Sequence, residues 1–144
     1  MSKHTDIIEL LPYAHPFRFV DELVHLSDDK AVGRYQIKKD EYFFEGHFPG
    51  NPIVPGAIIS EIMAQIGVVC LGLYLTPVED RPLVMPAFTN MNVDYLEYAK
   101  PGEWLTIESN KIYFRFNKLK CGVSCINENG TIIAKGELAG MIIK

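Results

Sequence analysis

Cysteine is scarce in this chain, and positive charge is not in excess. The three cysteines, Cys70, Cys121 and Cys125, are an odd number without CxxC spacing. This pattern predicts neither a disulfide framework nor a zinc site, and it fits free thiols in a reducing cytoplasm. The 14 Lys and Arg residues are outnumbered by 18 Asp and Glu, which gives a net charge of -4. That balance argues against an extended basic surface for duplex DNA and leaves room only for a local basic patch.

A secretory signal is also lacking. Asp6 and Glu9 interrupt the short apolar runs near the N-terminus, so no signal-peptide core is present and a cytoplasmic location is expected. Charged residues make up 22% of the chain against 48% hydrophobic ones, and this ratio excludes global disorder. The length of 144 residues suits a single domain over residues 1–144.

One run, residues 57–75, is apolar or small at nearly every position and reaches the roughly 20 residues that cross a bilayer. Glu61 and Gln65 lie one helical turn apart within it, and an ionisable group inside hydrocarbon is costly unless protein surrounds it. We therefore expect a buried helix that is apolar on all sides, within a soluble protein. Pro55 is suited to its first position, and Pro77 prevents its continuation.

Strands are expected on both sides of this helix. Alternating apolar residues predict a hairpin before it and about four strands after it, and Asn129-Gly130 is a strong hairpin turn signal. The expected strands are residues 17–26, 30–39, 83–92, 104–117, 120–126 and 131–143.

The order of these elements predicts an α+β fold with an antiparallel sheet, because strands and helices do not alternate. A strongly curved sheet that wraps the single helix buries it most simply. One sheet leaves part of an all-apolar helix uncovered, so association with a second copy of the chain is expected.

His47 is the histidine whose surroundings point to a function. It lies in a loop, residues 46–56, with three prolines and three glycines, which forbid regular structure and shape the backbone. Loops held in this way on a scaffold often carry functional residues. A hydrogen-bonded structural histidine is the alternative. The remaining histidines, His4, His15 and His25, have no acidic residue at an informative spacing.

Glu61 is the one charge in the apolar run, and carboxylates are seldom buried unless they are paired or neutralised. A neutral imidazole at His47 can accept a proton, and a carboxyl at Glu61 with a raised pKa can donate one. The Gly56 N–H belongs to the first helical turn, where it can bind a carbonyl oxygen that gains negative charge. A Glu61 that faces water at an edge of the fold is the alternative.

The segment GHFPGNPIVPGAIISEIMAQ, residues 46–65, resembles the signature of the (3R)-hydroxyacyl-acyl-carrier-protein dehydratases of FabZ type, with the same spacing of fourteen residues between His47 and Glu61. Residues 11–21, LPYAHPFRFVD, are similar to the opening motif of that family, and Pro101-Gly102-Glu103 is similar to a later Pro-Gly-Asp. The isomerising FabA type is disfavoured because it carries Asp at the position of Glu61.

The resemblance implies a hot-dog fold, in which an antiparallel sheet wraps one long helix. It also implies a homodimer, or a hexamer of three such dimers, in which His47 of one subunit faces Glu61 of the other. Neither a metal nor another cofactor is implied. An apolar acyl tunnel is expected along the interface. Candidates for its lining, each of which can equally be ordinary core, are Phe17, Phe48, Ile59, Met85 and Phe88.

The implied reaction removes water from a 3-hydroxyacyl thioester to give the trans-2-enoyl thioester, in fatty acid biosynthesis or a related polyene or lipid pathway. His47 is the expected base at C2, Glu61 positions or protonates the 3-hydroxyl, and Gly56 holds the thioester oxygen. The acyl group is expected on acyl carrier protein or coenzyme A, with no nucleic acid partner and no membrane insertion. Acyl carrier protein is acidic and requires local positive charge for docking. Candidates are Arg18, Lys100, Lys111, Arg115, Lys118 and Lys120.

Two alternatives stay open at this point. A hot-dog thioesterase would release a free thiol without an enoyl product, although thioesterases usually place their acid differently. A non-catalytic acyl-binding or assembly subunit would bind a ligand or a partner protein without turnover.

Overall fold

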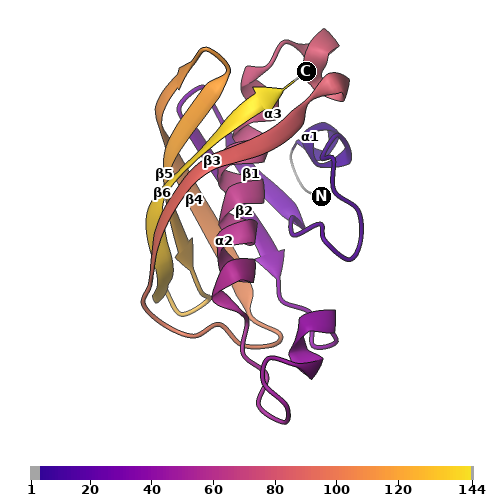
Figure 1. Cartoon of the computed structure of the whole chain (residues 1–144), viewed down its shortest axis with the longest axis vertical. Helices are drawn as coiled ribbons and strands as arrows, with labels where there is room; N and C mark the ends of the chain where they lie inside the picture. Colours follow the sequence, from indigo (N-terminus) through magenta and orange to yellow (C-terminus); the bar gives the residue numbers. More distant parts are fainter. Residues whose placement is uncertain (1–3, 144) are drawn as a thin grey trace.

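The computed structural model describes residues 4–143. Three helical segments run on from one another at its centre, and six strands form one sheet (Figure 1). The strands are β1 (Glu22–Leu26), β2 (Lys30–Gln36), β3 (Met85–Tyr95), β4 (Trp104–Arg115), β5 (Lys118–Ile126) and β6 (Ile132–Ile143). The helical elements are α1 (Thr5–Glu9), η1 (Tyr42–Glu45), α2 (Gly56–Ala64), η2 (Gln65–Cys70), α3 (Leu71–Leu75) and η3 (Val78–Leu83).

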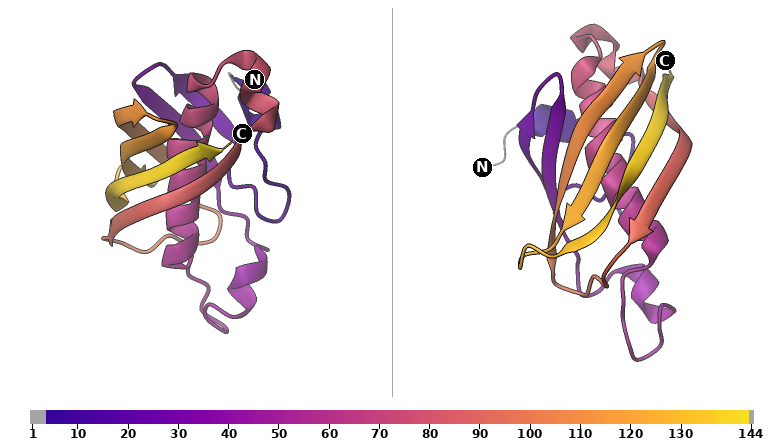
Figure 2. Two further views of the ribbon diagram at one scale, coloured as in Figure 1. Left: turned by 45° about the horizontal axis from the view of Figure 1, so that its top comes forward. Right: turned by 90° about the vertical axis from the view of Figure 1, so that its left-hand side faces the viewer.

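All neighbouring strands of the sheet are antiparallel, in the order β1-β2-β4-β5-β6-β3. Among the described residues, β1 and β3 are therefore the two edge strands. The sheet curves around the central helix, with β3 passing along one side of it and β1 and β2 along the other (Figures 1 and 2). The predicted α+β architecture, an antiparallel sheet wrapped around one helix, is confirmed.

The central helix runs from Gly56 to Leu75 through α2, η2 and α3, and 83% of the window that is apolar enough to span a membrane is buried inside the fold. The sheet approaches this helix closely at its two internal glycines. A Cβ at Gly67 would lie 3.1 Å from Val123 Cγ1, and one at Gly72 would lie 2.7 Å from Ile142 Cδ1. The long apolar run is therefore the core helix of this fold, as predicted from the sequence.

Several boundaries differ from the sequence prediction. The first strand begins at Glu22 rather than at residue 17, because the backbone at Phe17 and Phe19 hydrogen bonds to the Gln65 side chain instead of to a strand. Strand β2 ends at Gln36 rather than at residue 39, and β3 extends to Tyr95 rather than to residue 92.

The connection between β4 and β5 was also placed wrongly from the sequence. The two strands meet in a turn at Phe116 and Asn117, whose φ angles are 51° and 60°, and β5 already begins at Lys118. Positive φ is unusual for a bulky residue such as Phe, so Phe116 gave no signal that the turn begins there. Helix α2 begins at Gly56, one position after the predicted start at Pro55, which is the cap residue that precedes the helix.

Candidate active site

The loop before the central helix is held by backbone hydrogen bonds that fix the position of His47. The His47 N–H donates to Phe43 O of η1 at 3.1 Å, and the Ile53 N–H donates to His47 O at 3.1 Å. Phe48 and Asn51 exchange two backbone hydrogen bonds, at 2.8 and 3.1 Å, which close a tight turn. This loop extends beyond the end of the sheet, next to the start of α2 (Figure 1).

The ring of His47 has a defined orientation and tautomer. Its Nδ1 lies 2.9 Å from Ile53 O, and because a carbonyl oxygen only accepts hydrogen bonds, Nδ1 carries the proton. The ring stacks on Phe48 with 4.1 Å between centroids. In the neutral imidazole, Nε2 is then unprotonated and able to accept a proton.

A pocket of about 270 Å³ lies beside His47 and brings together four of the residues predicted from the sequence, His47, Phe48, Gly56 and Ile59. The Val54 N–H donates to Ala99 O at 3.0 Å and so ties this loop to the connection between β3 and β4. That connection forms the other wall of the pocket. The remaining lining residues are Ile53, Val54, Tyr95, Glu97, Tyr98 and Ala99.

Tyr95 at the end of β3 lies against the first turn of α2. A Cβ at Gly56 would lie 3.3 Å from the Tyr95 ring, and the Tyr95 hydroxyl hydrogen bonds with the Ser60 hydroxyl. A side chain at position 56 would press on this ring, and the Gly56 N–H belongs to the first turn of α2, beside the pocket. Sequence reasoning missed Tyr95 because it placed the residue beyond the end of its strand.

Glu61 is half-buried one turn further along α2. Burial raises the pKa of its carboxyl above the ordinary value, and a hydrogen bond from Gln65 Nε2 to Oε2, 2.9 Å long, partly offsets this shift. A carboxyl with a raised pKa can hold a proton closer to neutral pH and donate it to a leaving group.

Within one chain, His47 and Glu61 face different surroundings. Glu61 does not line the His47 pocket, and no hydrogen bond joins the two side chains within residues 4–143. The pKa of Tyr13, in the N-terminal segment, is raised by burial and by the charge of Glu61. Within a single copy of the chain, the side chains of His47 and Glu61 therefore do not meet in one pocket.

The other three candidates for the acyl tunnel lie outside the His47 pocket. Phe17 packs against Phe19, with ring centroids 5.1 Å apart, on the Gln65 side of the helix. Phe88 packs on Gly140 of β6, and the exposed Met85 pairs with Ile143. Met85 is ten residues from Tyr95 along β3, which is roughly 30 Å in an extended strand.

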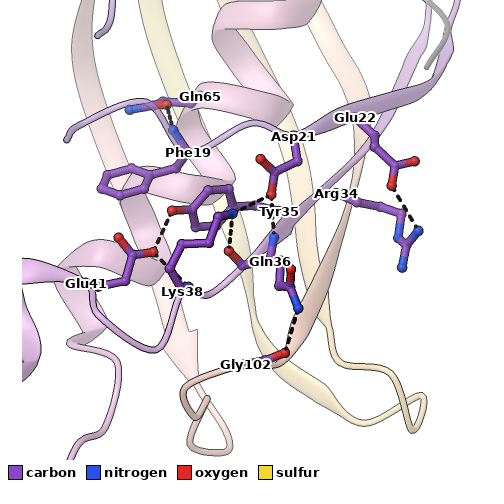
Figure 3. A network of polar contacts seen from close by, with 10 residues as sticks. All are labelled: Phe19, Asp21, Glu22, Arg34, Tyr35, Gln36, Lys38, Glu41, Gln65 and Gly102. Carbon is purple, nitrogen blue, oxygen red and sulfur yellow. Dashed lines mark hydrogen bonds and ion pairs between the residues drawn. The ribbon is translucent and has the colours of Figure 1, made fainter. Parts of the chain in front are cut away.

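A polar network holds the chain that leads into η1 (Figure 3). The Tyr35 hydroxyl donates to Glu41 Oε2 at 2.5 Å, and burial, followed by this hydrogen bond, raises the pKa of Tyr35. Lys38 Nζ lies 2.9 Å from Asp21 Oδ2 and 4.3 Å from the Tyr35 ring centroid. These contacts fasten β2 to the segment before the His47 loop.

The basic residues proposed for carrier docking are spread over the molecule and differ in availability. Lys111 and Lys120 form ion pairs with Asp29 and Glu137, at 3.5 and 3.2 Å. The others are Arg18 in the N-terminal segment, Lys100 between β3 and β4, and Arg115 and Lys118 at the β4–β5 turn. Among the described residues, no group of three or more His, Cys, Asp or Glu side chains is placed to hold a metal ion.

Comparison of the sequence with known families gives a match over most of the chain. The model of the FabA-like domain matches residues 11–138. The 3-hydroxyacyl-[acyl-carrier-protein] dehydratase FabZ of Caldicellulosiruptor saccharolyticus is 34% identical over 136 residues, which cover 93% of this chain and 94% of that protein. The protein of the same name from Geobacter metallireducens is 38% identical over 104 residues, or 72% of this chain and 69% of its own.

Solved structures share the fold at low sequence identity. The dehydratase heterocomplex ApeI:P from Xenorhabdus doucetiae matches with a TM-score of 0.78 and 15% identity, over 96% of this chain and 91% of that one. A hypothetical thioesterase from Streptococcus pneumoniae, solved with coenzyme A, matches with a TM-score of 0.61 and 14% identity over 85% and 84%. The predicted hot-dog fold is therefore confirmed. From the family match and the curated relatives, the chain belongs to the FabA-like family and, within it, to the FabZ-type 3-hydroxyacyl-[acyl-carrier-protein] dehydratases, which are hydro-lyases.

Proposed function

We propose that two copies of this chain together form the dehydration site, with His47 of one copy facing Glu61 of the other. The observation that carries this proposal is the separation of the two side chains within one chain, where Glu61 does not line the His47 pocket. The unpaired edge of β3, most of whose residues are exposed or half-buried, gives a second copy a surface to cover. A homodimer is the smallest assembly that joins both halves, and three dimers can associate further.

The proposed reaction starts at His47. Its Nε2 takes the C2 proton of the 3-hydroxyacyl thioester, since Nδ1 is occupied by the hydrogen bond to Ile53 O. The negative charge that develops on the thioester oxygen is stabilised by the Gly56 N–H at the start of α2. The C3–O bond breaks as Glu61 gives its proton to the departing hydroxyl, so that water leaves and the C2–C3 double bond forms. Proton transfer from His47 back to Glu61, directly or through solvent, restores the starting state.

The substrate is an acyl group on acyl carrier protein or on coenzyme A. Phe48 and Ile59 line the pocket beside His47 and are the tunnel residues that we retain next to the reacting atoms. Phe17 lies beside Gln65, one turn from Glu61, and belongs to the part of the tunnel that the second copy completes. Phe88 and Met85 are proposed only for its far end. The free buried cysteines, Cys70, Cys121 and Cys125, fit a soluble cytoplasmic enzyme.

A complementation experiment tests the shared site. His47→Ala and Glu61→Ala are each expected to lose most turnover of a 3-hydroxyacyl thioester, by about 10²–10⁴-fold. When the two variants are unfolded together and refolded, half of the dimers contain both, and each of these holds one site with an intact His47 and Glu61. Activity should then return to about a quarter of the wild-type value.

The same preparations separate the possible failures. Full activity in both single variants would contradict the assigned residues. Two inactive variants that stay inactive after mixing, while size-exclusion chromatography shows mixed dimers, would place both residues in one chain. The assay follows the enoyl product and free thiol by mass spectrometry, so that thiol release without enoyl product would favour the thioesterase alternative. Binding without either product would favour an acyl-binding subunit.

A further inference from the structure

Gln65 is a buried polar side chain that contacts the catalytic acid. It lies in the central helix at 0% exposure. Its Oε1 accepts a hydrogen bond from the Phe19 N–H at 2.8 Å, and its Nε2 donates to Phe17 O and to Glu61 Oε2, each at 2.9 Å. The bond to the Phe19 N–H is visible in Figure 3. The amide therefore joins the N-terminal segment of the chain to Glu61.

The chemistry of its partners fixes the orientation of this amide. The Phe19 N–H can only donate a hydrogen bond, so the oxygen of Gln65 must face it. Phe17 O can only accept, so the NH₂ group must face Phe17 and Glu61. The two amide protons are then both used, one for Phe17 O and one for Glu61 Oε2. A flipped amide would place two donors together at Phe19 and two acceptors together at Phe17.

The fixed amide also constrains the Glu61 carboxyl. Because a carbonyl oxygen accepts a hydrogen bond more strongly than a carboxylic hydroxyl does, the bond from Gln65 Nε2 favours the unprotonated form of Oε2. The proton of the neutral acid therefore belongs on Oε1. Oε1 has no hydrogen-bond partner in the part of the chain that the structure describes, and no side-chain oxygen there is both buried and unpartnered. Oε1 is thus accessible to a ligand or to solvent.

We propose that Gln65 is a positioning residue that confines the acidic proton of Glu61 to Oε1 and aims it at the 3-hydroxyl of the substrate. The inference rests on the proposed role of Glu61 as the acid of the dehydration. It adds that the protonated oxygen is selected by the core of the same subunit, through an amide held by Phe17 and Phe19. The N-terminal segment is then part of the catalytic geometry although it does not reach His47.

Among the described residues, burial and the hydrogen bond from Gln65 are the causes that shift the pKa of Glu61. Tyr13, in the N-terminal segment, is the titratable group whose pKa responds to the charge of Glu61. Burial and the Glu61 charge raise the pKa of Tyr13, so Tyr13 stays neutral throughout the range in which a carboxyl titrates. In the proposed dimer, His47 of the second copy is a further ionisable group that faces Glu61. Changes in the titration of Glu61 on substitution of Gln65 therefore report on the amide contact.

Infrared difference spectroscopy tests the placement of the proton. The stretching band of the protonated Glu61 carboxyl is identified as the band that disappears in Glu61→Gln. With the proton on Oε1, the C=O bond is C–Oε2, and its hydrogen bond from Gln65 lowers the band frequency. Gln65→Met, which keeps the side-chain volume but has no amide, should move the band to higher wavenumber. It should also move the titration midpoint of the band to higher pH, since the ionised carboxylate loses a donor.

The kinetics of the same variant distinguish a positioning role of Gln65 from a general loss of folding stability. Gln65→Met should reduce kcat about tenfold or more, leave KM nearly unchanged, and move the Glu61-dependent limb of the kcat–pH profile to higher pH. Ser109→Ala is the matched control, because the buried Ser109 hydroxyl donates to Gly67 O of the same helix at 2.8 Å without touching Glu61. Ser109→Ala should lower the Tm but leave the band and the pH profile unchanged.

A measurement on the wild-type protein covers the case in which Gln65→Met does not fold. One side-chain amide proton of Gln65 should change its NMR shift with the titration of Glu61, and this change should be absent in Glu61→Gln. An unshifted infrared band in folded Gln65→Met, or a Gln65 amide that ignores the titration, overturns the inference. If His47→Ala and Glu61→Ala instead keep full activity, the proposed function fails, whatever Gln65 does.

Discussion

The two halves of the proposed site are built in different ways. His47 is held on a loop by backbone hydrogen bonds and a carbonyl oxygen, and its pocket is walled by the connection after β3. Glu61 is held on the core helix, where its side-chain partner is the fully buried Gln65. Loop and turn geometry therefore orient the proposed base, His47, whereas burial sets the protonation of the proposed acid, Glu61.

The two halves therefore depend on different physical properties. For His47 the important property is the orientation of the imidazole ring, since the bond from Nδ1 to Ile53 O leaves Nε2 free. For Glu61 it is a protonation equilibrium, because burial raises its pKa. Substitutions at the two residues should therefore affect catalysis alike but affect folding stability differently.

The largest expected effect is loss of catalysis from both halves. His47→Asn keeps an amide N–H for Ile53 O but removes the proton acceptor at Nε2, and Glu61→Gln removes the acid at nearly constant volume. Each should lower kcat by about 10²–10⁴-fold, measured as formation of enoyl thioester. A smaller loss in one variant than in the other would show that the chemistry depends unequally on the two halves.

The second largest effect is expected at Gly136 on β6, which packs against β3, the edge strand that carries Tyr95 of the His47 pocket. Gly136 of β6 faces β3 so closely that a Cβ would lie 2.0 Å from Asn92 O. Gly136→Ala should therefore cost about 3 kcal/mol of folding stability or more, because backbone must move. Chemical denaturation measures it, with Gly122→Ala on β5 as the control, since nothing lies within 4 Å of a Cβ there. A fully stable Gly136→Ala protein would contradict the tight β3–β6 contact.

Glu61→Gln should stabilise the folded chain at neutral pH. The folded-state pKa of Glu61 is raised above the ordinary 4.5, so its stabilising contribution is complete below that value and is lost as the pH rises through the folded pKa. The Tm difference between variant and wild type should thus grow from about pH 4.5 upward, by about 2–4 °C for each kcal/mol. A Tm difference for Glu61→Gln that falls with rising pH would contradict the burial of the carboxyl.

The smallest effect is expected at Tyr95. Tyr95→Phe removes the hydrogen bond with Ser60 and keeps the ring over Gly56, so it should cost about 1 kcal/mol. Tyr98→Phe is the control, because Tyr98 is 65% exposed and its hydroxyl should contribute nothing measurable. Thermal unfolding of both variants measures the difference in Tm. Equal Tm values would show that the hydrogen bond between Tyr95 and Ser60 does not stabilise the wall of the His47 pocket.

Much of the fold follows from local signals. The apolar run with one carboxylate predicted the buried helix, and the Asn-Gly turn predicted the hairpin of β5 and β6. These local signals gave a wrong prediction where the backbone hydrogen bonds to a side chain instead of to a neighbouring strand. Residues 17–21 alternate like a strand, yet Phe17 and Phe19 hydrogen bond to Gln65, which is 46 residues from Phe19 in the sequence. No local pattern encodes such a contact.

The candidate site shows the same limit. His47, Glu61 and Gly56 were identified from their residue types and from the family resemblance, and the tautomer of His47 became evident only with Ile53 O in place. Tyr95, Glu97 and Tyr98 lie more than forty residues after His47 in the chain, and they meet its pocket because Val54 pairs with Ala99.

The sequence by itself determined the order of strands and helix, the fixed loop around His47 and the single carboxylate in an apolar run, because propensity, hydrophobic periodicity and turn chemistry are local properties. Only the tertiary structure decided which oxygen of Glu61 is free, which ring nitrogen of His47 is free, and that one chain keeps the two apart. Hydrogen bonds between residues distant in sequence are set by packing, and packing is a property of the folded chain as a whole.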